Sequence, residues 1–207
     1  QAFGSWAGGD MIEAGFVANE NPPKLKTHDR YGHRIDEVEF HPAYHRVMAA
    51  AMKHELHALP WNEARTGAHV VRSALGYINS QFEAGHGCPI TMTYAAIPAL
   101  RHQPDVASVW EPLITSTEYD PRCLPAEQKS GATIGMGMTE KQGGSDVRSN
   151  TTKAYPIGKG GPGGDYELVG HKWFFSAPMC DAWLVLANAE QGISCFLVPK
   201  WRPDNCR

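Results

Sequence analysis

The sequence has no excess of charge of either sign, since 19 Lys and Arg stand against 22 Asp and Glu, for a formal net charge of −3 at pH 7. Proteins that bind the phosphate backbone of nucleic acids normally show a clustered excess of basic residues. Here the basic residues are scattered among acids, so we do not expect these residues alone to bind DNA. The sequence also lacks an apolar run long enough to cross a bilayer, and its first ten residues lack the features of a signal peptide. No membrane association is predicted.

Paired cysteines are lacking too. The five cysteines are odd in number and widely spaced, and none forms a CxxC pair, so neither a disulfide framework nor a zinc site is expected. This pattern favours reduced thiols in a cytoplasmic protein. Ten histidines are present, but no cluster of them has a convincing third ligand, so no metal site is predicted.

What is present is an ordinary globular composition in two parts. Of the 207 residues, 42% are hydrophobic and 20% are charged, which suits one large domain or two modest ones. The hydrophobic period changes from helical to alternating near residue 131, which predicts an α+β fold with an all-helical domain followed by an antiparallel β domain. The boundaries that we predict are an extended, largely irregular arm over 1–40, a helical domain over 41–130, and a β domain over 131–207 that we expect to be incomplete.

The helical part contains four predicted helices. The first starts at the His41–Pro42 pair, because Pro suits the first turn of a helix, and ends at Pro60. The second follows apolar residues at every third or fourth position over 68–82. The segment 89–100 is apolar nearly all round, which predicts a buried central helix. A fourth helix follows Pro104.

The second part reads as a series of short strands. Each is a β-branched or alternating run bounded by Gly, Pro, Asp or Asn. The runs cover residues 133–138, 166–169, 173–175, 183–187 and 193–198. The Gly-rich stretch 155–165 predicts a flexible hairpin loop. Because no helix separates the strands, the sheet is predicted to be antiparallel.

The segment 136–145 carries the first candidate site. Gly143 and Gly144 let the backbone approach a ligand and turn N–H groups toward one concavity, which suits a phosphate or pyrophosphate. Thr139 and Ser145 add hydroxyl donors. The segment is neither a G-x-G-x-x-G fingerprint opening a helix nor a P-loop. On these grounds alone, an ordinary turn is the commoner interpretation.

The second candidate site is the run Lys172-Trp173-Phe174-Phe175-Ser176. Successive aromatic residues on a strand place rings on both faces of a sheet. At least one ring is then free to stack on a planar ligand, with the hydroxyl of Ser176 as a hydrogen-bond donor. Taken alone, the run fits a strand buried on both faces better.

Together the two segments resemble the flavin-binding pair of the acyl-CoA dehydrogenase family. The shared features are a Thr-Glu strand end running into Gly-Ser-Asp, then a β-hairpin, then Gly-x-Lys-aromatic-aromatic-x-Ser/Thr. The resemblance implies FAD as cofactor, held by a middle β domain, with Thr139 near the pyrimidine edge, Ser145 on the phosphates and Ser176 near flavin N5. The family commonly has Trp-Ile-Thr where this chain has Phe-Phe-Ser. The cofactor-binding residues that it implies are Met136, Gly137, Met138, Thr139, Glu140, Lys141, Gln142, Gly143, Gly144, Ser145, Phe174, Phe175 and Ser176.

Longer strings are similar to one branch of this family, the AidB-type flavoproteins of the adaptive response to DNA alkylation. They are GMGMTEKQGGSDVRSNTT, GHKWFFSAP, CPITMTYAA, NPPKL and DRYGHRIDEVEFHPAYH. The branch implies FAD, a homo-tetramer, binding of double-stranded DNA and at best weak acyl-CoA dehydrogenase activity. Two alternatives stay open: a fragment of a metabolic short- or branched-chain acyl-CoA dehydrogenase, and a cofactor-free helical and β interaction module.

The family's catalytic base lies in a C-terminal helical domain, as do much of the adenine end of the FAD site and the DNA-binding surface of the branch. These 207 residues lack that domain. We therefore expect an N-terminal fragment with no catalytic residue of its own, which holds FAD weakly, does not turn over acyl-CoA and does not bind DNA appreciably. Glu140, the acid of the flavin motif, is expected to make structural hydrogen bonds rather than to act as the base.

Overall fold

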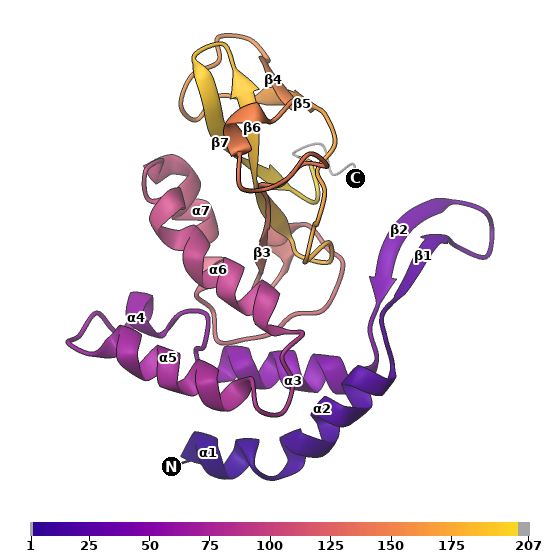
Figure 1. Ribbon diagram of the computed structural model, residues 1–207, viewed down its shortest axis with the longest axis vertical. Helices are drawn as coiled ribbons and strands as arrows, with labels where there is room; N and C mark the ends of the chain where they lie inside the picture. Colours follow the sequence, from indigo (N-terminus) through magenta and orange to yellow (C-terminus); the bar gives the residue numbers. More distant parts are fainter. Residues whose placement is uncertain (1, 203–207) are drawn as a thin grey trace.

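The computed structural model describes residues 2–202 and confirms the predicted α+β fold. In Figure 1 the helices form the lower part of the molecule and the larger sheet the upper part, with α6 and α7 beside the sheet. The α-helices are α1 (Ala2–Ala7), α2 (Asp10–Glu20), α3 (Pro42–Lys53), α4 (Leu59–Asn62), α5 (Ala68–Asn79), α6 (Gly87–Leu100) and α7 (Pro104–Ile114). The strands are β1 (Lys24–His28), β2 (Arg34–Glu39), β3 (Ile134–Gly137), β4 (Lys153–Pro156), β5 (Tyr166–Val169), β6 (Ala182–Ala189) and β7 (Gly192–Pro199).

The prediction of an extended, irregular arm over residues 1–40 is wrong for most of its length. Helices α1 and α2 occupy its first half, and β1 and β2 form a hairpin that projects from the body of the molecule (Figure 1). The helices bury Phe3 and Met11 in a cluster with side chains of α3. Gly15 permits this packing, because a Cβ there would lie 2.1 Å from the carbonyl oxygen of Phe82. The packing partners lie far along the chain, so local composition concealed the helices.

The first predicted helix begins where expected and ends early. Pro42 is the first residue of α3, and the His41 side chain caps the helix by accepting a backbone N–H. The helix ends at Lys53 rather than at Pro60, because Glu55 adopts the left-handed region with φ 56°. Pro60 instead lies in the first turn of α4, where the missing N–H of a proline costs nothing.

Helix α6 joins the two parts of the molecule. It was expected to be buried all round, but Thr91 and Ala95 are exposed, so only one face is buried. On that face, the hydroxyl of Thr93 accepts a hydrogen bond from the backbone N–H of Ile134 at 3.0 Å. The same helix packs with α7, β3 and β6 in a second hydrophobic cluster that includes Ile97 and Leu184. The strand that leads to the candidate site is therefore held on the helical part.

The five-stranded sheet is mixed, so the prediction of an antiparallel sheet is wrong in part. Its order is β3-β6-β4-β5, and β7 pairs with β6 along the whole length of that strand. The pairs β6–β7 and β4–β5 are antiparallel, whereas β3 and the start of β4 run parallel to β6. The β4–β5 hairpin and a long loop over 170–181 carry the chain from β3 to the start of β6. This excursion replaces the helix that usually connects parallel strands.

Three further features concern the described residues 2–202. No helix among them is long and apolar enough to span a membrane. No group of three or more metal-binding side chains forms there. Cys88, Cys123, Cys180 and Cys195 are free thiols, while Cys206 lies outside the described residues.

Candidate functional site

The first half of the candidate site is the end of β3 and the tight turn after it. The turn closes when the N–H of Gly143 donates to the carbonyl oxygen of Glu140 at 3.0 Å. Gly143 has φ +136°, a conformation that residues with a Cβ rarely adopt. Gly144 then approaches Thr139 so closely that a Cβ would lie 2.8 Å from the threonine Oγ1. The glycine pair thus folds the turn back onto the strand end, as the sequence indicated.

The second half of the site is a loop, and the predicted strand over 173–175 is wrong. No residue of that run is assigned to a strand, and Phe174 has φ +59°. A residue in the left-handed region reverses the direction of the backbone and breaks the alternation of faces that a strand requires. The loop nevertheless pairs once with the first segment, because the N–H of Trp173 donates to the carbonyl oxygen of Thr139 at 2.9 Å.

The two phenylalanines of the loop have different surroundings. Phe175 is half-buried against Gly137, where a Cβ would lie 2.6 Å from the Phe175 ring, and its ring centroid is 5.7 Å from that of Trp183. Phe174 points outward and is 83% exposed. One ring therefore fixes the loop on the sheet, and the other is free to meet a ligand.

A buried ion pair ties the two halves together. The carboxylate of Glu140, a residue only 2% exposed, lies 3.0 Å from the ammonium Nζ of Lys172. It also accepts hydrogen bonds from the backbone N–H groups of Thr151 and Thr152 and from the hydroxyl of Thr151. Burial raises the pKa of Glu140, but these hydrogen bonds outweigh burial and the pKa lies below its ordinary range. The structural role expected for Glu140 is confirmed.

The remaining residues of the first segment divide between the exposed turn and the strand, where Met136 and Met138 pack against the second hydrophobic cluster. Lys141, Gln142, Gly144 and Ser145 are exposed, whereas Met136 and Met138 are half-buried on the strand. The exposed Ser176 ends the second segment. Within residues 2–202, the hydroxyls of Thr139, Ser145 and Ser176 have no hydrogen-bond partner, so these three donors are available to a ligand.

Sequence reasoning missed several residues that support the site. The side chain of Asn150 donates to the carbonyl oxygen of Met138 at 2.9 Å. Thr151 and Thr152 hold Glu140, and Lys172 closes the cluster. The signal was present as the polar string SNTT that follows the glycine turn. Nothing local in that string distinguishes a buried support from a solvated loop.

Two protein families match this chain. The family of the adaptive response protein AidB N-terminal domain matches residues 1–121, and the acyl-CoA dehydrogenase middle domain matches residues 135–205. The AidB protein of Escherichia coli (strain K12) is 50% identical over 200 residues, which are 96% of this chain and 36% of that protein. Acyl-CoA dehydrogenase family member 11 of Caenorhabditis elegans is 25% identical over 95% of this chain and 33% of that protein. The chain spans about a third of the length of these relatives.

Two solved structures share the architecture. The apo form of Bd2924 superimposes with a TM-score of 0.82 at 28% identity, covering 96% of this chain and 40% of that one. Caenorhabditis elegans ACDH-11, solved in complex with C11-CoA, gives a TM-score of 0.82 at 24% identity, covering 99% of this chain and 35% of that one, and so shows a shared fold. The chain therefore belongs to the AidB family, with an AidB N-terminal domain followed by an acyl-CoA dehydrogenase middle domain.

Proposed function

We propose that the turn after β3 and the loop over 172–176 hold the flavin of FAD, in a protein that protects or repairs DNA under alkylation stress. The observation that carries the proposal is the meeting of the two segments. The Trp173 N–H binds the Thr139 carbonyl at 2.9 Å, and Phe175 packs on Gly137. Two stretches that are separated by a hairpin in sequence thus lie side by side and form one edge of the proposed site.

The groups at this edge suit a dinucleotide. Phe174 offers an exposed ring for stacking on a planar ring system. The hydroxyls of Thr139 and Ser176 are hydrogen-bond donors beside it, and Ser145 follows the glycine turn, where backbone N–H groups suit phosphate oxygens. These residues, with the rest of Met136–Ser145 apart from the buried Glu140, would hold the cofactor. Glu140 and Lys172 would support the turn from its buried side without touching the cofactor.

When bound, FAD supplies a hydride acceptor for the α,β-dehydrogenation of an acyl thioester. The residues of this chain bind and orient that acceptor. We assign no catalytic base here, because the carboxylate of Glu140 is buried and already accepts hydrogen bonds from Thr151 and Thr152. A general base must reach the proton that it removes.

For the whole protein we propose acyl-CoA as a ligand, with dehydrogenase activity that is weak or vestigial. A structural relative was solved with C11-CoA, and the AidB N-terminal domain favours the alkylation response over a metabolic dehydrogenase. We also propose a cytoplasmic homo-tetramer that binds double-stranded DNA through a region outside these residues. Their near-neutral charge supports that location for the DNA-binding surface.

A flavin titration tests the proposal. The complete product of the gene is expected to bind FAD and to quench its fluorescence saturably, and the 207 residues alone are expected to bind it more weakly. Phe174→Ala should weaken binding about tenfold, because stacking on an aromatic ring contributes about 1–3 kcal/mol. Phe16→Ala is the matched control, since Phe16 is 64% exposed on α2, away from the site. Absence of saturable binding to the complete product would overturn the proposal.

A further inference from the structure

A second, polar cavity lies at the opposite end of β3 from the flavin site. Its volume is about 180 Å³. Thr133, which precedes β3, lines it, whereas the proposed flavin residues follow the strand. The rest of the lining comes from β2 and the residue after it, α3, α6, the segment over 119–129 and the residues that flank the β6–β7 hairpin. The cavity therefore lies between the helical part and the sheet.

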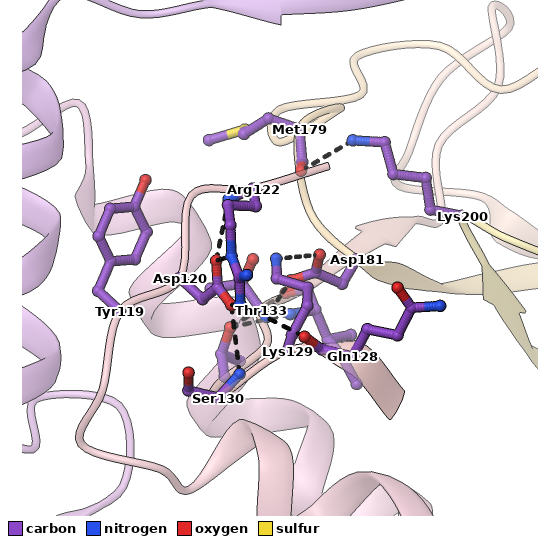
Figure 2. A network of polar contacts seen from close by, with 12 residues as sticks. Tyr119, Asp120, Arg122, Gln128, Lys129, Ser130, Thr133, Met179, Asp181 and Lys200 are labelled. Carbon is purple, nitrogen blue, oxygen red and sulfur yellow. Dashed lines mark hydrogen bonds and ion pairs between the residues drawn. The ribbon is translucent and has the colours of Figure 1, made fainter. Parts of the chain in front are cut away.

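Three carboxylates line the cavity, those of Glu37, Asp120 and Asp181, and protein donors hold the last two (Figure 2). Asp120 accepts from the guanidinium and N–H of Arg122 and from the N–H of Ser130. Asp181 accepts from the ammonium of Lys129 at 2.5 Å and from the N–H of Thr133 at 2.9 Å. Asp120 thus accepts four hydrogen bonds and has little capacity left, whereas Asp181 accepts two.

The donors of the lining are not saturated. Lys129 has a side chain that is 4% exposed, and within residues 2–202 its ammonium has only Asp181 as acceptor. The ammonium of Lys200 donates to the carbonyl oxygen of Met179 at 3.2 Å and forms no ion pair within residues 2–202, although its charge acts to lower the pKa of Asp181. An ammonium carries three donors. Each lysine therefore has donors left, in a place where unpaired polar groups are costly.

Lys129 and Lys200 each use one of their three donors, which leaves four unused. A tyrosine adds a fifth. Tyr44 is 8% exposed, and its hydroxyl is buried without a hydrogen-bond partner. Burial raises the pKa of Tyr44 well above its ordinary value, so the hydroxyl stays protonated and can donate. Buried hydroxyls without a partner are uncommon in folded proteins, and each calls for a ligand or an ordered water.

Part of the cavity lining is apolar. The rings of Phe40 and Tyr44 stack with centroids 4.0 Å apart and an interplanar angle of 20°. Met48, Pro89 and Met179 complete the wall. The cavity thus combines a surplus of hydrogen-bond donors on one side with apolar surface on the other.

We infer that this cavity binds a small organic carboxylate, with its oxygens on Lys200 and Tyr44 and its alkyl part against Phe40 and Met48. A carboxylate supplies acceptors and no donors, which suits the unused donors of Lys129, Lys200 and Tyr44. Its negative charge suits an ammonium that has no carboxylate partner. Drug-sized ligands occupy pockets of about 300–1,000 Å³, so this smaller cavity suits an acid of a few carbon atoms. The inference does not depend on flavin binding.

The test is a titration of the full chain with sodium butyrate, read as the midpoint of thermal unfolding and by calorimetry. Butyramide is the uncharged control of the same shape, and inorganic phosphate is the anion without an alkyl part. We expect butyrate to raise the midpoint saturably, and the two controls to act weakly or not at all. A ligand that binds only the folded state raises stability in this way.

Two variants locate the site. Lys200→Met and Tyr44→Phe should each weaken butyrate binding about tenfold or more, because a hydrogen bond to a charged group is worth about 1.5–3 kcal/mol. Lys153→Met and Tyr77→Phe are the matched controls, since both side chains are exposed on other elements, and they should leave the affinity unchanged.

Four results would each overturn the inference. They are equal shifts with butyrate and butyramide, binding of phosphate but not butyrate, unchanged affinity in Lys200→Met, and no saturable effect up to about 10 mM. A cavity that holds water only would show the last result.

Discussion

The ring of Phe175 lies against the α-carbon of Gly137, so closely that a Cβ at position 137 would come within 2.6 Å of the ring. This contact joins the strand end to a loop from the far side of the β4–β5 hairpin. The N–H of Trp173 makes the second link by donating to the carbonyl oxygen of Thr139. Gly137 is thus the position at which the two halves of the proposed flavin site depend on each other.

Gly137→Ala should therefore loosen the site. The added methyl group would displace the Phe175 ring, and overpacking of this kind typically costs about 1–3 kcal/mol of unfolding free energy. In the complete gene product, flavin affinity should fall as well. Urea unfolding followed by flavin titration measures both effects. Gly76→Ala on α5 is the control, because nothing lies within 4 Å of a Cβ there and the change should be neutral or stabilising. Equal stability of the two variants would contradict the packing described.

A substitution at Phe174 should change ligand affinity and stability in opposite directions. Its side chain is 83% exposed and its backbone is left-handed, with φ +59°. Phe174→Gly should raise the free energy of unfolding by up to about 1 kcal/mol, because the left-handed region penalises residues with a Cβ. The same variant should bind flavin more weakly, because it lacks the aromatic ring. A gain in stability without a loss of affinity would remove Phe174 from the proposed site.

The Glu140–Lys172 pair should behave as one unit. Removing one partner of a buried ion pair leaves an uncompensated charge and costs about 3–5 kcal/mol. Glu140→Ala and Lys172→Met should each show such a loss in urea unfolding, and the double variant should lose much less than the sum. Glu39→Gln is the control, because the Lys26–Glu39 pair is exposed and should contribute little. Additive losses would show that the buried pair does not couple the two segments.

His57 gives the protein a pH dependence on the acid side. Burial, opposed by a hydrogen bond to the carbonyl oxygen of Ser116 and assisted by the nearby charge of Arg72, lowers the pKa of His57 from 6.5 to about 4. The unfolded state therefore binds more protons between these two values, so stability is complete above pH 6.5 and is lost as the pH falls toward 4.

Between pH 7 and pH 5, the unmodified chain should lose about 2 kcal/mol more unfolding free energy than His57→Gln, whose side chain does not titrate. Urea unfolding at several pH values measures this difference. His102→Gln is the control, because His102 is exposed on the surface. Parallel pH profiles for the unmodified chain and His57→Gln would show that His57 is not buried as neutral imidazole.

Local chemistry in the sequence predicted much of this arrangement. The start of α3 at Pro42 and the start of α7 at Pro104 follow from the fixed φ of proline. The turn at Gly143 follows from a conformation that favours glycine. Each of these features depends on one or two residues and their own backbone, so it can be read without knowledge of the partners.

Long-range contacts decided the rest. The helices α1 and α2 depend on α3 and on the backbone at Phe82, which Gly15 alone could not indicate. The run around Phe174 has the composition of a strand, yet its N–H pairs with Thr139 and its backbone turns away. The parallel pairing of β3 with β6 depends on how the β4–β5 hairpin is placed.

The sequence by itself determined the family, the two-part organisation and the residue types available to a flavin. These follow from short sequence motifs and from the spacing of hydrophobic residues along the chain. Only the tertiary structure decided that Phe175 faces inward and Phe174 outward, and that Glu140 is satisfied from within. The physical reason is that a side chain's role depends on which donors and surfaces reach it, and here those come from segments distant in the chain.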